Sequence, residues 1–145
     1  MLDAIPAQDA ATELMGFIGL VKNAQDQVRE SGFVVTRSGA ASHLASNPVN
    51  ERAISLDELG IIVHRETLHR IDPAFGWHLW GTDLCLQAEQ RFPARPARTL
   101  GVPIFHNSNF DGTLPAGFDA SGKILLEKYP ELAIIPSLCK CLVRA

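Results

Sequence analysis

The sequence predicts an α/β fold in which helices flank a mixed sheet in three layers. Short apolar runs occur at residues 14–21, 59–63 and 100–105, and each has the length of a buried strand. Two further segments, 81–92 and 118–129, repeat apolar residues at the period of an amphipathic helix. Strands that alternate with helices along the chain are typical of layered α/β folds.

The first third of the chain contains two expected strands joined by a polar segment. Residues 14–21 are apolar almost throughout, which favours a buried strand. Residues 22–31 are polar and predict a solvated connection to a second strand at 32–37. Residues 38–50 are rich in Ser, Ala, Gly and Asn and predict a loop.

The middle third is expected to pass from strand to helix. Residues 59–63 predict a central strand, and residues 66–71 predict a short helical turn that an Asp-Pro pair closes. Gly81 or Thr82 is expected to cap the next helix, which runs to about Phe92.

The last third is expected to supply one strand, one helix and an apolar tail. Residues 100–105 predict a strand that leads into a loop at 107–117. The helix at 118–129 is expected to end before Pro130, because proline cannot continue a helix. Residues 132–143 form the apolar tail.

The composition indicates an ordinary globular protein. Of its 145 residues, 46% are hydrophobic and 20% are charged, so residues 1–145 are expected to form one domain. The net charge of −3 argues against nucleic acid or an anionic membrane as the main partner, since both attract basic surfaces. No apolar run is long enough to span a bilayer, and no secretory signal pattern is present. We therefore expect a cytoplasmic protein, which the odd count of three cysteines also favours.

The segment from Phe75 to Ala88 carries the strongest chemical signal. It contains both tryptophans of the chain, Trp77 and Trp80, shortly before Asp83. A tryptophan can stack on the C–H face of a sugar ring and can bond a hydroxyl group through its N–H. Asp83, near a helix start, is either a residue that interacts with the helix dipole or a general base that takes a proton from an attacking hydroxyl.

Histidines and acids near strand ends are further candidates. His78 lies between the two tryptophans. His106 ends a predicted strand, where α/β folds place ligands, and is interpreted either as structural or as a ligand for a metal or phosphate. Asp57 and Glu58 precede the strand at 59–63, either in a solvated turn or as acceptor-binding carboxylates at the edge of a cleft.

Several segments resemble the glycosyltransferases of the GT-A fold, in particular the large family-2-like group. The similar segments lie in order over about residues 14–142, and they include LDELGIIVHRE (56–66), DPAF (72–75), GWHLWGTDLCLQA (76–88), VPIFHNS (102–108) and KYP (128–130). Their common order and spacing make the resemblance fairly specific. It implies the C-terminal, acceptor-side part of a GT-A fold.

The resemblance also implies an activity, the transfer of a sugar from a nucleotide-sugar donor to a hydroxyl of a glycan or another acceptor. Asp83 matches the base of inverting members, and Trp77, His78 and Trp80 match the edge of the acceptor or donor sugar site. His106 matches the histidine that helps to hold a metal–diphosphate group, which implies Mg²⁺ or Mn²⁺ in a complete site.

The sequence departs from the family pattern in two places. It has no Asp-x-Asp pair, which family members use on the metal of the nucleotide, and Thr82 stands where an acid usually precedes Asp83. The nucleotide-binding half is therefore expected to be absent, and His106 alone offers too few ligands for a metal. An incomplete sheet exposes apolar surface, so a homo-oligomer or a partner over the open face is expected.

Two other functions remain open. The chain can be a non-catalytic remnant or assembly module of the GT-A fold that self-associates. It can also be a small metal-dependent hydrolase that uses His78, Asp83 and His106.

Overall fold

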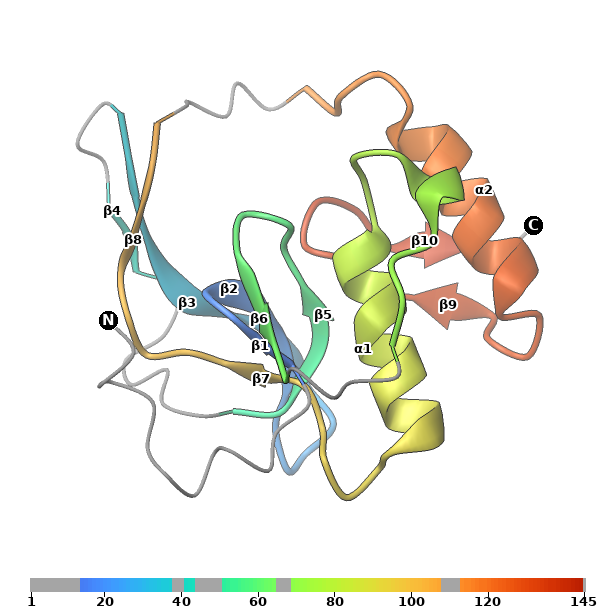
Figure 1. Ribbon diagram of the computed structural model, residues 1–145, viewed down its shortest axis with the longest axis horizontal. Coiled ribbons are helices and arrows are strands. Elements are labelled where there is room, and N and C mark those ends of the chain that lie inside the picture. Colours follow the sequence, from blue (N-terminus) through green and yellow to red (C-terminus); the bar gives the residue numbers. More distant parts are fainter. Residues whose placement is uncertain (1–13, 38–40, 44–50, 65–68, 108–112, 145) are drawn as a thin grey trace.

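The computed structural model describes residues 14–37, 41–43, 51–64, 69–107 and 113–144 (Figure 1). The elements in chain order are β1 (Leu14–Gly16), β2 (Ile18–Lys22), β3 (Val28–Thr36), β4 (Ala41–His43), β5 (Ala53–Leu56), β6 (Ile61–Val63), the 3-10 helix η3 (Pro73–Phe75), α1 (Trp80–Arg91), β7 (Arg98–Thr99), β8 (Ile104–His106), α2 (Phe118–Lys128), β9 (Ile134–Ile135) and β10 (Leu142–Val143). Within the described ranges, no helix is long and apolar enough to cross a membrane.

The strands form several small sheets. In the first, β1 lies between antiparallel β6 and parallel β7. The second has the order β4–β3–β2–β5 with antiparallel neighbours, and β8 adds to it parallel to β3. The third is the antiparallel pair β9–β10. The prediction of an α/β fold with mixed sheets and helices is thus confirmed, but the described strands are divided among separate sheets.

The strand predicted at 14–21 is present and is divided at Phe17 into β1 and β2. The prediction that 22–31 is only a connection was wrong, because β3 already begins at Val28 and pairs with β2. The exposed side chains of residues 28–30 explain the polar pattern. The loop predicted at 38–50 lies largely outside the described residues, and the part that is described forms β4.

Two of the expected strands, at 59–63 and 100–105, needed correction. The expected central strand is β6, which lies at the edge of its sheet. The buried strand is instead β5, which was not predicted from the sequence. The helical turn predicted at 66–71 falls partly outside the described residues, and the turn that is seen is η3. The expected strand at 100–105 is replaced by β7 and β8 on either side of a bend.

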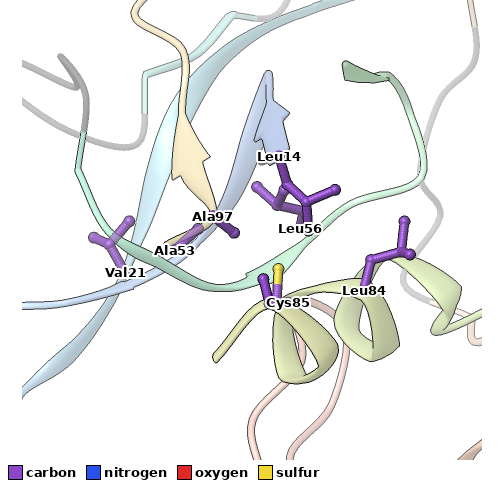
Figure 2. Close-up of a cluster of buried hydrophobic side chains, with 8 residues drawn as sticks. Leu14, Val21, Ala53, Leu56, Leu84, Cys85 and Ala97 are labelled. Carbon is purple, nitrogen blue, oxygen red and sulfur yellow. The ribbon is translucent and has the colours of Figure 1, made fainter. Parts of the chain in front are cut away.

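Helix α1 lies between the sheets and α2, which packs with β9 and β10 on the far side (Figure 1). A first hydrophobic cluster extends from α1 across β5 to residues of β1, β2 and the segment before β7, and Figure 2 shows it (Leu14, Val21, Ala53, Leu56, Leu84, Cys85, Ala88 and Ala97). At the start of α1 the contact is backbone to backbone. A Cβ at Gly81 would lie 2.3 Å from the carbonyl oxygen of Leu56, so only glycine permits this approach.

A second hydrophobic cluster joins η3, the start of α1, α2 and the β9–β10 pair. Its buried members are Phe75, Leu79, Phe118, Leu125, Tyr129, Ile135 and Leu142. The partly buried Trp80 packs against both clusters. The two clusters therefore fix the start of α1 from both sides.

Candidate functional site

Trp77 has the most exposed large hydrophobic side chain of the described residues, at 85%. It lies between Gly76 and Leu79, which have φ values of +60° and +67°. A left-handed conformation costs a residue such as Leu79 about 1–2 kcal/mol. The burial of Leu79, which is 3% exposed, offsets that cost. The buried leucine thus anchors the segment while the indole of Trp77 stays in solvent.

His78 and Trp80, the aromatic residues nearest to Trp77 in the sequence, are held in packing contacts. The ring of His78 lies 6.0 Å from the ring of Phe118, centroid to centroid. Trp80 lies between the two hydrophobic clusters. Of the three aromatic residues predicted to bind substrate, Trp77 is therefore the one with a largely free ring face.

Asp83 is fully buried, with 0% of its surface exposed. Its Oδ1 accepts a hydrogen bond of 2.7 Å from the Tyr129 hydroxyl group. Its Oδ2 accepts hydrogen bonds of 2.7 Å from Gln87 Nε2 and 2.9 Å from Lys128 Nζ. A general base has to reach the proton that it removes. In this conformation the carboxylate of Asp83 meets the end of α2 and not solvent.

Glu58 is the acid that contacts the first turn of α1. Its Oε1 accepts a hydrogen bond of 3.0 Å from the backbone N–H of Gly81. The prediction that Gly81 or Thr82 is the N-cap was wrong, because the N-cap is Leu79 and the side-chain acceptor comes from the turn after β5. Burial raises the pKa of Glu58 to about 7, against the opposing effect of the Gly81 N–H.

Asp57 closes the turn that carries Glu58. Its Oδ1 accepts a hydrogen bond of 2.9 Å from Leu59 N, and its own N–H donates to the Ile18 carbonyl oxygen over 3.0 Å. Burial raises the pKa of Asp57, while the Leu59 N–H and the charge of His106 act in the opposite direction. His106, at the end of β8, therefore lies within electrostatic range of Asp57.

The predicted metal ligand is His106. In the part of the chain that the structure describes, no group of three or more His, Cys, Asp or Glu side chains is placed to hold a metal ion. Mg²⁺ and Mn²⁺ require more oxygen ligands than His106 and Asp57 supply together. These residues alone do not fit a metal site, so no step is assigned to a metal.

Two cavities lie away from this turn. One, of about 760 Å³, lies between the turn after β2, β5, α1 and the segment around β9, and its apolar wall includes Cys85 and Leu86. The other, of about 400 Å³, lies beside edge strand β6 and is lined in part by Trp80 and Leu84. Trp77, Glu58 and His106 line neither of these two cavities.

Two contributors to this region were not proposed as site residues from the sequence. Lys128 was noted only as part of a KYP segment, yet its ammonium group pairs with Asp83 across 45 positions of sequence. Glu58 was considered together with Asp57 as an acceptor-binding carboxylate, but only Asp57 was chosen as a site residue. A buried acid on the inner face of a helix requires a nearby cation. Asp83 in the apolar helix pattern is therefore the sequence signal that a basic residue such as Lys128 should lie close to it.

Comparisons with known proteins do not identify a family or a function for this chain. No protein-family model matches the chain, and no curated protein is significantly similar to it. The functional proposal therefore rests on the residues and on their geometry.

Proposed function

We propose that the chain is a glycosyltransferase-like unit that binds a carbohydrate acceptor at the start of α1. One observation carries this proposal: Trp77 is exposed in the turn just before α1, and the Glu58 carboxylate is bonded to the Gly81 N–H in the first turn of the same helix. An indole face covers the apolar face of a sugar ring, and a carboxylate accepts hydrogen bonds from its hydroxyl groups. Together they meet the two chemical requirements for binding a sugar.

The proposal assigns proton transfer to Glu58. A general base is most effective when its pKa lies near the working pH, and the pKa of Glu58 is about 7. Asp83, the base that the resemblance implies, would first have to leave its ion pair with Lys128 to reach an acceptor. We therefore keep Asp83 as the alternative base.

The arrangement of the resembling segments supports the same class of protein. The segment 56–66 brings Glu58 to the start of α1, and the segment 76–88 supplies the turn that carries Trp77 and most of α1. The segment 128–130 meets α1 at Asp83. The proposal includes a GT-A-type arrangement of layers. The chain has no Asp-x-Asp pair. We therefore propose that the nucleotide-sugar and its metal ion bind, in contact with His106, only in a site that residues absent from this chain complete.

A second candidate is a non-catalytic assembly module. Apolar side chains are exposed on several strands, among them Val63 in edge strand β6 (45%), Phe105 in β8 (62%) and Val143 in β10 (62%). Such side chains favour contact with a second copy. Sedimentation velocity over a range of concentrations should then show a dimer or a larger oligomer, and a monomer throughout the range would contradict this candidate.

The acceptor proposal is tested by isothermal titration of the chain with short oligosaccharides of glucose, galactose and N-acetylglucosamine. At least one of these should bind the parent protein, and Trp77→Ala should abolish the heat of binding without unfolding the protein, because the indole is largely in solvent. Phe105→Ala, a second exposed aromatic side chain, is the matched control and should bind normally. If no oligosaccharide binds, or if both variants bind equally well, the proposed function is wrong.

A further inference from the structure

Lys128, the last residue of α2, contacts three parts of the molecule at once. Its Nζ lies 2.9 Å from Oδ2 of Asp83 and 3.5 Å from Oδ2 of Asp72. It also lies 5.4 Å from the centre of the Phe75 ring, a distance typical of a cation–π contact. One ammonium group therefore links α2 both to α1 and to η3, the short helix that precedes Trp77.

The buried carboxylate of Asp83 fixes where this ammonium group lies. A carboxylate removed from water requires hydrogen bonds and an opposite charge. Tyr129 and Gln87 are neutral donors to Asp83, and Lys128 supplies the ion pair. Movement of Lys128 away from Asp83 would weaken the charge compensation of a fully buried group, so the ammonium group is held in place.

The same ammonium group holds the short helix in front of Trp77. Asp72 is the N-cap of η3, and its Oδ1 accepts a hydrogen bond of 3.0 Å from Ala74 N, while its Oδ2 is the atom near Lys128. At the other end of η3, the Ser121 hydroxyl group donates to the Phe75 carbonyl oxygen over 2.8 Å. Both ends of η3 are thus attached to α2, and the exposed indole follows two residues later.

We propose that Lys128 is a positioning residue for Trp77: its ammonium group, held by Asp83, binds Asp72 and thereby fixes the segment that presents the indole. Where it concerns carbohydrate affinity, this inference rests on the proposed function. Where it concerns the order of Trp77, it rests on the contacts alone. In this conformation Asp83 then supports the site from the protein interior.

Asp72→Asn separates the two roles of Asp72, which are its ion pair with Lys128 and its N-cap of η3. An asparagine keeps the oxygen that caps Ala74 but removes the charge that faces Lys128. The measurement uses a Trp80→Phe background, in which Trp77 is the sole tryptophan, and compares fluorescence anisotropy and quenching by acrylamide. In that background, Asp72→Asn should lower the anisotropy of Trp77, increase its quenching, and weaken oligosaccharide binding about twofold to fivefold, as expected for a partly exposed ion pair. High salt should loosen Trp77 when Asp72 is present and have little effect in Asp72→Asn.

Three further variants distinguish a general loss of protein stability from a specific loss of Trp77 positioning. Lys128→Gln should change Trp77 in the same direction as Asp72→Asn, and Lys128→Arg should restore most of the anisotropy. Tyr129→Phe removes a hydrogen bond to Asp83 but leaves the pair with Asp72, so it should lower stability and leave Trp77 unchanged. The inference is overturned if Asp72→Asn and Lys128→Gln leave Trp77 unchanged, or if Tyr129→Phe alters it as much as they do.

Failure of the inference and failure of the proposed function give different results. If the parent protein binds no oligosaccharide, the proposed function fails and the fluorescence results still decide the positioning role. If the parent binds an oligosaccharide and Asp72→Asn binds it with equal affinity, the positioning inference fails and the proposed function stands.

Discussion

The Asp83 carboxylate and the Lys128 ammonium group form an ion pair of 2.9 Å between α1 and α2, in which Asp83 is 0% exposed and the Lys128 side chain is 32% exposed. The acid that sequence patterns favour as a base is therefore, in this structure, a buried contact between two helices. The partly exposed Glu58 occupies the start of α1 instead.

Lys128→Met should destabilise the protein by about 2–3 kcal/mol. A buried carboxylate that loses its partner costs about 3–5 kcal/mol, and the partial exposure of Lys128 reduces this figure. Urea unfolding measures the change in the free energy of unfolding. Lys123→Met, at an exposed position of the same helix, is the control and should change it by less than about 0.5 kcal/mol. Equal stability of the two variants would contradict the importance of the buried pair.

Gly81→Ala and Gly122→Ala place the same methyl group in two helices, and only Gly81→Ala should clearly destabilise the protein. At Gly81 the new Cβ would lie 2.3 Å from the Leu56 carbonyl oxygen, so we expect a loss of about 1–3 kcal/mol. At Gly122 the nearest atom is the flexible end of Leu142 at 3.0 Å, and the higher helix propensity of alanine offsets the contact by up to about 1 kcal/mol. Thermal unfolding of both variants checks this difference. A Gly81→Ala protein as stable as the parent would show that α1 does not approach β5 so closely.

Glu58 should make stability depend on pH between about 4.5 and 7. Its folded-state pKa of about 7 lies above the ordinary value of 4.5, so in this range the folded protein binds more protons than the unfolded protein does. Its stabilising contribution is full below pH 4.5 and is lost as the pH rises through 7. The free energy of unfolding of the parent, relative to that of Glu58→Gln, should therefore fall as the pH rises. Urea unfolding of both proteins from pH 4.5 to 8 tests this, and a constant difference would mean that the pKa of Glu58 is not raised.

The two helices could be predicted because their buried residues repeat at helical spacing, as Leu84 and Ala88 do in α1. The start of β3 could not be predicted, because the side chains of Arg29 and Glu30 are exposed and show no strand pattern. These residues belong to the strand only through their backbone pairing with β2. The strand β5 was missed because a run of four residues gives too short a pattern to separate strand from loop.

The candidate site was predicted less completely than the helices. The segment around Trp77 was identified from its composition, but its exposure depends on the left-handed conformation of Leu79, which no residue pattern indicates. The burial of Asp83 depends on Lys128 and Tyr129, which lie far away in the sequence and come close only after α2 has packed on α1. Contacts of this kind follow from tertiary structure and have no local signature.

Nuclear magnetic resonance of the two indole N–H groups tests the central claim most directly. Trp77 and Trp80 are the only tryptophans of the chain, so the spectrum holds two assignable indole signals. As an oligosaccharide that binds in the calorimetric titration is added, the Trp77 signal should shift in a saturable manner, and the signal of the partly buried Trp80 should shift much less. A saturating shift confined to Trp80, or no shift of either signal, would contradict a carbohydrate site at the start of α1.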